Sequence, residues 1–174
     1  NKEFSYFKKI IKLLIKIQSI KNRKIKNFQN RSYIIPKYDK KILIEETNLF
    51  CDWYVKKNLK KSNKDKFSKE FKKIIKKLVS NLKLKNNVFV HRDFHVSNLM
   101  MINNRIGVID SQDALIGNKA YDLASLIDDV RLKTSKSLKK KVFNFYLKNQ
   151  NKLEILKFKN DFEILSILRN LKII

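Results

Sequence analysis

Most of the chain carries apolar residues at helical spacing, with lysine at many of the positions between them. The first such series is Phe4, Phe7, Ile11, Leu14 and Ile17. Residues three and four apart share one face of a helix, so this series predicts an amphipathic helix over residues 2–20. A polar loop is expected over 22–38. It is followed by a helix over 40–60 that Asp39 is suited to cap.

Several more helices are predicted along the chain. One has a single apolar face made of Phe67, Phe71, Ile74, Ile75, Leu78 and Leu82. Others are expected over 119–131, over 136–149 and from 151 to the end of the sequence. The lysine-rich faces opposite are interpreted as solvated surfaces. Trp53 and Tyr54 are expected to pack in a core.

The pattern changes in the middle of the chain. Residues 88–90 form a short apolar run that predicts a strand leading into a polar loop at 91–98. Two further apolar runs, 99–102 and 105–109, flank Asn103 and Asn104. Because asparagine tolerates positive φ, this pair predicts a two-residue hairpin turn. A polar loop follows from 110 to about 118. Helices around one small hairpin indicate an α+β fold.

The net charge is large, but it gives little information about the function. Lys and Arg number 41 against 16 Asp and Glu, giving +25 in a chain of 174 residues, which is expected to form a single domain. Such an excess raises nucleic acid or an anionic membrane as a partner. Most of it is lysine, however, and Asn, Ile and Phe are also abundant, as in proteins from AT-rich genomes. We therefore interpret the excess as a solvated lysine surface. A basic nucleic-acid-binding module remains the alternative, to be distinguished by lysines clustered on one face.

Cysteine content and hydropathy indicate a cytoplasmic setting. Cys51 is the only cysteine, so no disulfide can form within the chain and a reducing compartment is expected. Lysines interrupt every apolar run, which argues against a membrane span. The sequence opens on Asn1 and shows no signal peptide, so we expect a fragment of a longer protein.

The 91–98 loop and Asp110 carry the chemistry. Phosphoryl transfer from a magnesium-bound nucleotide needs a carboxylate beside the attacking hydroxyl and oxygen ligands on the metal. Asp93 is the candidate catalytic base, and Asn98 and Asp110 are the candidate Mg²⁺ ligands. Asp110 ends the second hairpin strand, which is expected to return it beside the loop. The alternative is that Asp93 and Asp110 are ordinary turn residues.

Other residues around this segment have more than one interpretation. His91 and Arg92 are expected to support the loop. Asp122 is expected to accept hydrogen bonds from the loop's backbone amides, or else to be an ordinary acid at the start of a helix. His95 is expected either to contact the acceptor or to brace the loop. Gln112 and Asp113 are expected either to reach substrate or metal or to be solvated.

Together these residues resemble the aminoglycoside phosphotransferase and choline kinase family, the small-molecule branch of the protein-kinase-like fold. The pattern is His-x-Asp-x-x-x-x-Asn at 91–98, Ile-Asp at 109–110 and Asp-Leu-Ala at 122–124. Within that group the segments 90–100, 112–117 and 120–126 resemble the bacterial N-acetylmuramate/N-acetylglucosamine kinases of cell-wall sugar recycling. More weakly, so do 49–54 and 169–172.

The resemblance implies ATP as phosphate donor, Mg²⁺ as cofactor and the anomeric hydroxyl of an amino-sugar as acceptor. Alternative acceptors are an aminoglycoside, choline or homoserine. A kinase-like protein that only binds its ligand is the third class, and the intact Asp93, Asn98 and Asp110 argue against it.

The sequence departs from the family in two ways. Ser111 stands where these sugar kinases usually carry an aromatic residue. The only glycines are Gly107 and Gly117, so there is no glycine-rich loop to cover the phosphates. We expect residues 1–174 to form a C-terminal lobe without its N-terminal nucleotide lobe and without its last helices. Such a fragment is expected to be inactive alone.

Overall fold

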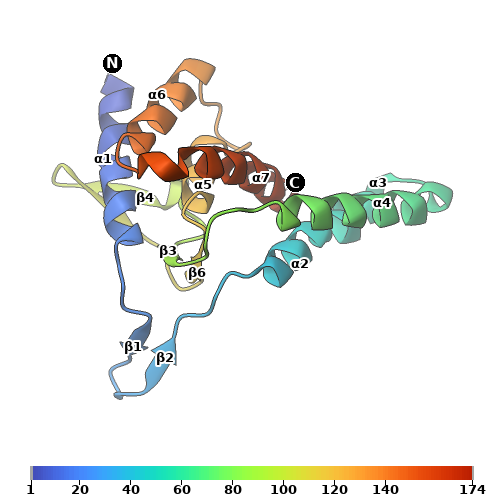
Figure 1. Ribbon diagram of the computed structural model, residues 1–174, viewed down its shortest axis with the longest axis horizontal. Helices are drawn as coiled ribbons and strands as arrows, with labels where there is room; N and C mark the ends of the chain where they lie inside the picture. Colours follow the sequence, from blue (N-terminus) through green and yellow to red (C-terminus); the bar gives the residue numbers. More distant parts are fainter. Residues whose placement is uncertain (1, 174) are drawn as a thin grey trace.

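Helices make up most of the structure, and three two-stranded antiparallel sheets accompany them (Figure 1). The computed structural model describes residues 2–173, except for the side chains of residues 61 and 62. The helices are α1 (Lys2–Gln18), α2 (Lys40–Phe50), α3 (Lys56–Asn58), α4 (Lys61–Ser80), α5 (Tyr121–Ile127), α6 (Lys136–Leu147) and α7 (Ile155–Ile173). The expectation of an α+β chain with mostly helical content is confirmed.

The three sheets are small and pair different parts of the chain. They pair β1 (Lys24–Lys26) with β2 (Ser32–Ile34), β3 (Val88–Val90) with β6 (Leu115–Gly117), and β4 (Leu99–Ile102) with β5 (Arg105–Val108). The β1–β2 pair projects from the helical body as a hairpin (Figure 1). β3 and β6 lie within the body, where β3 also contacts α1.

The hydrophobic core is centred on α5. All seven residues of this helix are buried, because it packs against both α6 and α7. Helix α1 contributes Ile11 and Leu14, which are fully buried, and packs against α6. The apolar face predicted for the first helix is thus the face that is buried. Helix α5 therefore has a fixed position, and the residues at its start have little freedom to move.

Helices α2, α3 and α4 extend from the body as an arm (Figure 1). Between α2 and α3 lies one turn of π-helix, Cys51–Val55. Asp39 caps α2 as predicted, since its Oδ1 accepts a hydrogen bond from the Ile42 amide at 3.0 Å. The predicted helix at 40–60 thus exists, although the π-turn interrupts it and it ends at Asn58.

The tight hairpin after the 91–98 loop is confirmed. Strands β4 and β5 pair from Leu99 opposite Val108 to Ile102 opposite Arg105. The two residues between them have positive φ, 47° at Asn103 and 64° at Asn104. Two successive residues in this conformation match the right-handed twist of the flanking strands.

Several predictions about elements were wrong. The segment 22–38 is not only a loop, because it contains β1 and β2; every residue of both strands is exposed, so no apolar alternation marked them. Strand β6 lies inside the expected loop at 110–118, as a three-residue run paired with the distant β3. Helix α5 is shorter than the predicted 119–131. A 3-10 turn, Lys152–Glu154, comes before α7.

The expectation that Trp53 and Tyr54 pack in a core was also wrong. Their exposures are 75% and 46%. Both lie on the arm, and Tyr54 stacks on Phe50 with ring centroids 5.1 Å apart. Ile74, assigned to the apolar face of α4, is 58% exposed. Cys51 is a buried free thiol.

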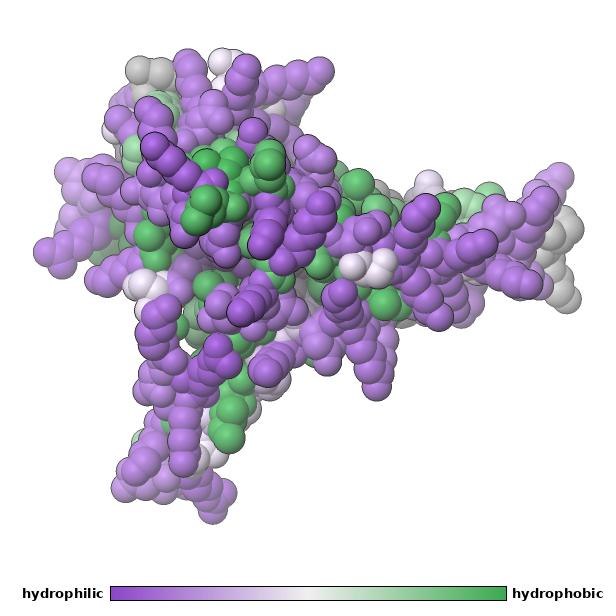
Figure 2. Space-filling model, viewed as in Figure 1, coloured by the Kyte–Doolittle hydropathy of each residue, from purple (hydrophilic) through white to green (hydrophobic). Residues whose placement is uncertain are grey.

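The face of the molecule shown in Figure 2 is mostly hydrophilic. On the face shown in Figure 2, hydrophobic residues appear only in smaller areas between hydrophilic ones. No described helix combines the length and apolar character that a membrane crossing requires.

Candidate active site

The 91–98 loop leaves β3 and leads directly into the β4–β5 hairpin. The hairpin ladder continues past its last strand pair, because the Ile109 amide donates to the Asn98 carbonyl at 3.0 Å. Asn98 comes just before β4, and Asp110 follows Ile109. The two candidate metal ligands therefore lie at the same end of the hairpin, although they are 12 positions apart in the sequence.

Asn98 is oriented by a hydrogen bond inside the loop. Its Nδ2 donates to the Asp93 backbone carbonyl at 3.0 Å. Because the amide nitrogen is used in this way, the Oδ1 atom remains to accept a hydrogen bond or bind a cation. The Asp93 side chain is half-buried, and its carboxylate forms no hydrogen bond or ion pair within residues 2–173. Asn98 and Asp93 thus present free oxygens from one short segment.

A buried carboxylate at the start of α5 holds the first residues of the loop. Asp122 is fully buried, and its two oxygens accept hydrogen bonds from the amides of His91 and Arg92 at 2.8 and 3.0 Å. Burial raises the pKa of Asp122 to about 7, although these two hydrogen bonds act in the opposite direction. These are the contacts expected of Asp122 from the sequence. They fix the backbone immediately before Asp93.

His91 joins the loop to the end of the hairpin. Its ring Nε2 lies 3.0 Å from the Ile109 carbonyl oxygen. A carbonyl can only accept, so Nε2 carries the proton. Burial lowers the pKa of His91, although the Ile109 carbonyl favours the charged form. His91 therefore connects the segment that holds Asp93 to the residue before Asp110.

Two non-glycine residues at this site have left-handed backbone conformations. The φ angles are 74° at Arg92 and 68° at Asp110. This region is costly for residues with a Cβ, and it persists where surrounding contacts impose it. At Arg92 one such contact is Asp122. The strained residues stand directly before Asp93 and at the candidate metal ligand.

Arg92 connects the loop to the arm and to α7. Its guanidinium pairs with Glu46 of α2, donates to the Asp113 carbonyl at 3.2 Å and lies 5.4 Å from the centre of the Tyr38 ring. Lys172 of α7 is a second partner of Glu46, at 3.2 Å. Sequence reasoning missed Glu46, which is 46 positions from Arg92. The only sequence signal for Glu46 was its position as an acidic residue on the apolar side of a predicted helix.

A second charged cluster lies beside His95. Burial lowers the pKa of His95, and the positive charges of Arg131 and Arg169 act in the same direction. Both arginines pair with Asp129, at 2.6 and 3.2 Å. Burial alone would raise the pKa of Asp129, but hydrogen bonds and charge from Arg131 and Arg169 outweigh it and keep the pKa low. Asp129 and Arg131 were not predicted from the sequence. Arg169 was noted only because residues 169–172 weakly resemble the sugar kinases.

Gln112 and Asp113 flank the candidate metal ligand from the following loop. Gln112 Nε2 donates to Asp110 Oδ1 at 2.5 Å. Asp113 is exposed and contributes its backbone carbonyl to Arg92. In residues 2–173 no cluster of three or more His, Cys, Asp or Glu side chains could hold a metal. Asn98 and Asp110 would suit Mg²⁺, which typically takes one or two carboxylates and completes its shell with water and phosphate oxygens.

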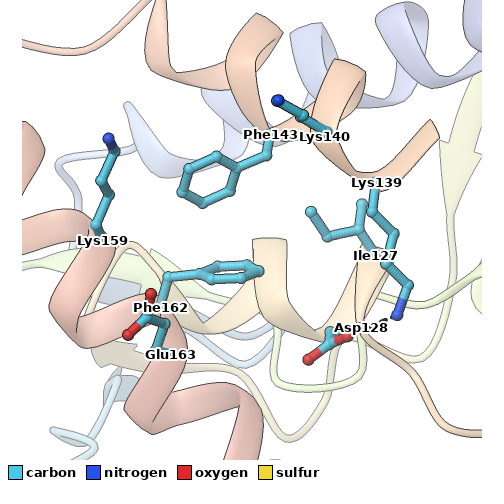
Figure 3. Close-up of a pocket in the computed structure, with 8 residues that line it drawn as sticks. All are labelled: Ile127, Asp128, Lys139, Lys140, Phe143, Lys159, Phe162 and Glu163. Carbon is cyan, nitrogen blue, oxygen red and sulfur yellow. Dashed lines mark hydrogen bonds and ion pairs between the residues drawn. The ribbon is translucent and has the colours of Figure 1, made fainter. Parts of the chain in front are cut away.

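A mainly apolar pocket lies away from the 91–98 loop. It has a volume of about 390 Å³ and lies between the end of α5, α6 and α7. In Figure 3, Phe143 and Phe162 project into it, and Lys139 turns aside to pair with Asp128 at 2.6 Å. None of the candidate catalytic residues lines this pocket. The site at the 91–98 loop is assigned from its chemistry rather than from the size of a cavity.

Comparison with known proteins matches this chain to phosphotransferases. The sequence model of the family described as "Phosphotransferase enzyme family" matches residues 5–156. The N-acetylmuramate/N-acetylglucosamine kinase of Neisseria meningitidis serogroup B is 40% identical over 100 residues, which are 58% of this chain and 30% of that protein.

Other relatives carry the same name. The kinase of Pseudomonas aeruginosa is 35% identical over 96 residues, which are 55% of this chain and 28% of that protein. The kinase of Caulobacter vibrioides is 30% identical over 92 residues, which are 50% of this chain and 25% of that protein. The resemblance identified in the sequence is confirmed, and the match spans less than a third of each of these relatives.

Proposed function

The chain belongs to the phosphotransferase enzyme family, and from this premise we propose that it forms the C-terminal lobe of a kinase that phosphorylates a hydroxyl group of a small molecule. The observation that carries the proposal is the Asp122 carboxylate, which binds the backbone amides of His91 and Arg92. A general base contributes most when its position is fixed before the reaction begins. Asp122 gives Asp93 that fixed position.

Asp93 is proposed as the catalytic base. Its free carboxylate would accept a hydrogen bond from the acceptor hydroxyl and orient that oxygen for attack on the transferred phosphoryl group. It would take the proton as the new bond to phosphorus forms. His91 and Arg92 position the loop, and His95, Gln112 and Asp113 are proposed as contacts for the acceptor.

Asn98 and Asp110 are proposed to hold Mg²⁺, with ATP as phosphate donor. Bound there, the ion would neutralise charge on the nucleotide phosphates. The structure supports this donor set, because Asn98 Nδ2 is engaged with Asp93 and its Oδ1 is free. The hydrogen bond from Gln112 orients the Asp110 carboxylate. The nucleotide-binding lobe that such a kinase requires is proposed to lie outside residues 1–174.

The proposed acceptor is the anomeric hydroxyl of N-acetylmuramate or N-acetylglucosamine. The names of the relatives at 30–40% identity support this choice. A C1 hydroxyl is more acidic than an ordinary sugar alcohol, so a base such as Asp93 can take its proton late in the reaction. A chain with a net charge of +25 also suits a neutral or anionic sugar better than a polycationic aminoglycoside.

The experiment is an acceptor panel with the complete protein. The protein is incubated with Mg·ATP and N-acetylmuramate, N-acetylglucosamine, kanamycin, choline or homoserine, and ³¹P NMR follows the product. We expect the signal of an anomeric sugar phosphate with the amino-sugars only. Turnover of another acceptor alone would refute the sugar assignment and keep the kinase. No turnover of any acceptor, with ATP bound, would count against the kinase itself.

A further inference from the structure

A second pocket, with a different chemical character, lies at the other end of β3 from the 91–98 loop. Its volume is about 410 Å³, within the range of small-molecule sites. Its lining residues come from the segment that leads into β3, from the residues just before α5, and from the 3-10 turn and first turn of α7: Lys83, Leu84, Lys85, Asn87, Val88, Lys119, Glu154 and Lys157. Four of these eight residues are lysine and one is acidic.

The wall that carries Lys83 and Lys85 is fixed, although it has no regular secondary structure. The amides of Lys83 and Leu84 donate to the buried Asp161 carboxylate at 2.9 and 2.8 Å. Further along, the Asn87 amide donates to the Gly117 carbonyl at 3.0 Å. Lys83 and Lys85 are both exposed, and both line the pocket. The backbone is therefore organised before any ligand arrives.

The opposite wall carries two more lysines, Lys119 and Lys157, and the single carboxylate of the pocket. Lys119 Nζ pairs with Glu154 Oε2 at 2.5 Å, and the Lys119 side chain is only 17% exposed. Lys157 lies three residues after Glu154 and therefore on the same side of the helix start. The ion pair with Lys119, and to a smaller extent the charges of Lys157 and Lys85, hold the pKa of Glu154 below its usual value. Glu154 thus lies within reach of three lysine charges.

We propose that this pocket binds a compact polyanion that carries at least two phosphate groups. Four lysines against one glutamate leave the lining three positive charges in excess. Glu154 can compensate only one ammonium, and it is engaged with Lys119. Several ammonium groups around one pre-organised hollow favour a ligand with several negative oxygens over a single monoanion. The site is separate from the candidate active site and does not depend on the proposed function.

The test uses pyrophosphate as the probe, without Mg²⁺ or nucleotide. Isothermal titration calorimetry of the full chain, at matched ionic strength, should give one site for pyrophosphate and weaker binding of orthophosphate. The variant Lys85→Gln/Lys157→Gln should raise Kd about tenfold or more, because each lysine contributes a charge-assisted hydrogen bond. The variant Glu154→Gln should lower Kd about fivefold, since it removes the carboxylate that competes for the lysines.

A matched control is available on α6 and α7. Lys140→Gln/Lys159→Gln removes the same number of charges from the apolar pocket of Figure 3, and Lys159 is only two residues from Lys157. The Kd of this control variant should change less than about twofold, as expected for screened charges that do not line the basic pocket. If both double variants weaken pyrophosphate binding equally, the effect comes from net charge alone and the proposal is overturned. So would unchanged or weaker binding in Glu154→Gln, or no binding by the unaltered chain.

Discussion

At the scale of single residues, the proposed chemistry depends on a few polar side chains with unequal roles. Asp93 has a carboxylate without a partner in residues 2–173, whereas both oxygens of Asp122 are engaged by backbone amides. The Asp93 carboxylate is therefore free to take part in the reaction, whereas the Asp122 carboxylate holds the backbone of the loop in place. Substitution of each carboxylate should affect different measurements.

Asp93→Asn in the complete enzyme should lower kcat by about two orders of magnitude or more, as expected when a positioned general base is removed. Nucleotide affinity should change little, because the variant keeps the shape of the loop. Steady-state kinetics and nucleotide titration measure the two effects separately. Asp52→Asn, at an exposed ion pair on the arm, is the control and should behave like the unaltered enzyme. A near-normal kcat in Asp93→Asn would rule out the role as base.

Asp122→Asn should lower the free energy of unfolding, because the new amide group points a donor at a backbone donor; the cost is about 1–3 kcal/mol. The effect should depend on pH. The folded pKa is about 7 and the usual value is near 3.9, so the folded state holds the proton more tightly. The contribution of Asp122 is therefore complete below pH ~4 and is lost as pH rises towards 7. Urea unfolding across this range should show the stability of the unaltered chain falling relative to the variant. A constant difference would contradict the shift.

Only those residues of the site that lie in one short segment could be predicted from the sequence. Residues 91–98 and 110 share a local pattern of polar residues between apolar strands. Glu46 could not be assigned in this way, because its role follows from packing of α2 against α7, which brings it to Arg92 and Lys172. Trp53 was assigned to a core from its residue type alone, but it lies on a projecting arm.

At the scale of elements, local signals predicted some structures and missed others. The β4–β5 hairpin could be predicted because its turn residues and both strands lie within ten positions. Strands β3 and β6 are 25 positions apart at their closest, and three apolar residues in a polar loop do not reveal a distant partner. The β1–β2 hairpin has no buried face, so no hydrophobic alternation marks it.

The Asn103-Asn104 turn sets the hairpin that returns Asp110 to Asn98, and its stability can be tested at one position. Asn104→Ala should lower the free energy of unfolding by about 1 kcal/mol, because alanine is strained at a φ of 64°. Asn104→Gly should be neutral or slightly stabilising, since glycine adopts this conformation freely. Thermal unfolding of the two variants gives the comparison. If alanine and glycine have the same effect, the left-handed turn is not what limits stability there.

The link between α5 and α7 should depend on Asp129, whose partner Arg169 is only 3% exposed. Asp129→Asn leaves this arginine buried without a carboxylate, which should cost about 3 kcal/mol. The pKa of Asp129 is kept low, so its contribution is present above pH ~4 and is lost as pH falls further. Asp128→Asn, at the neighbouring and more exposed ion pair with Lys139, should cost less than about 1 kcal/mol. Equal losses in both variants would show that burial of Arg169 is not the cause.

At the scale of the whole molecule, the positive charge is spread rather than gathered. Lysines lie exposed on α1 and on α4, which are at opposite ends of the molecule in Figure 1. A nucleic-acid-binding module would be expected to concentrate its basic residues along one face. The spread therefore favours the interpretation of a solvated lysine surface. Against this background, the four lysines that line one pocket are a local concentration of charge.

A net charge of +25 also predicts how the molecule responds to salt. Like charges repel in the compact state, and NaCl weakens that repulsion as the Debye length falls from about 30 to 8 Å between 0.01 and 0.15 M. The melting temperature should therefore rise by a few degrees, equivalent to about 1 kcal/mol. Sucrose at equal osmolality serves as the control for effects that do not involve charge. Pyrophosphate should raise the melting temperature further at matched ionic strength, and this increment should disappear in Lys85→Gln/Lys157→Gln while the NaCl effect remains. A melting temperature independent of NaCl would mean that the spread charges do not repel enough to affect folding.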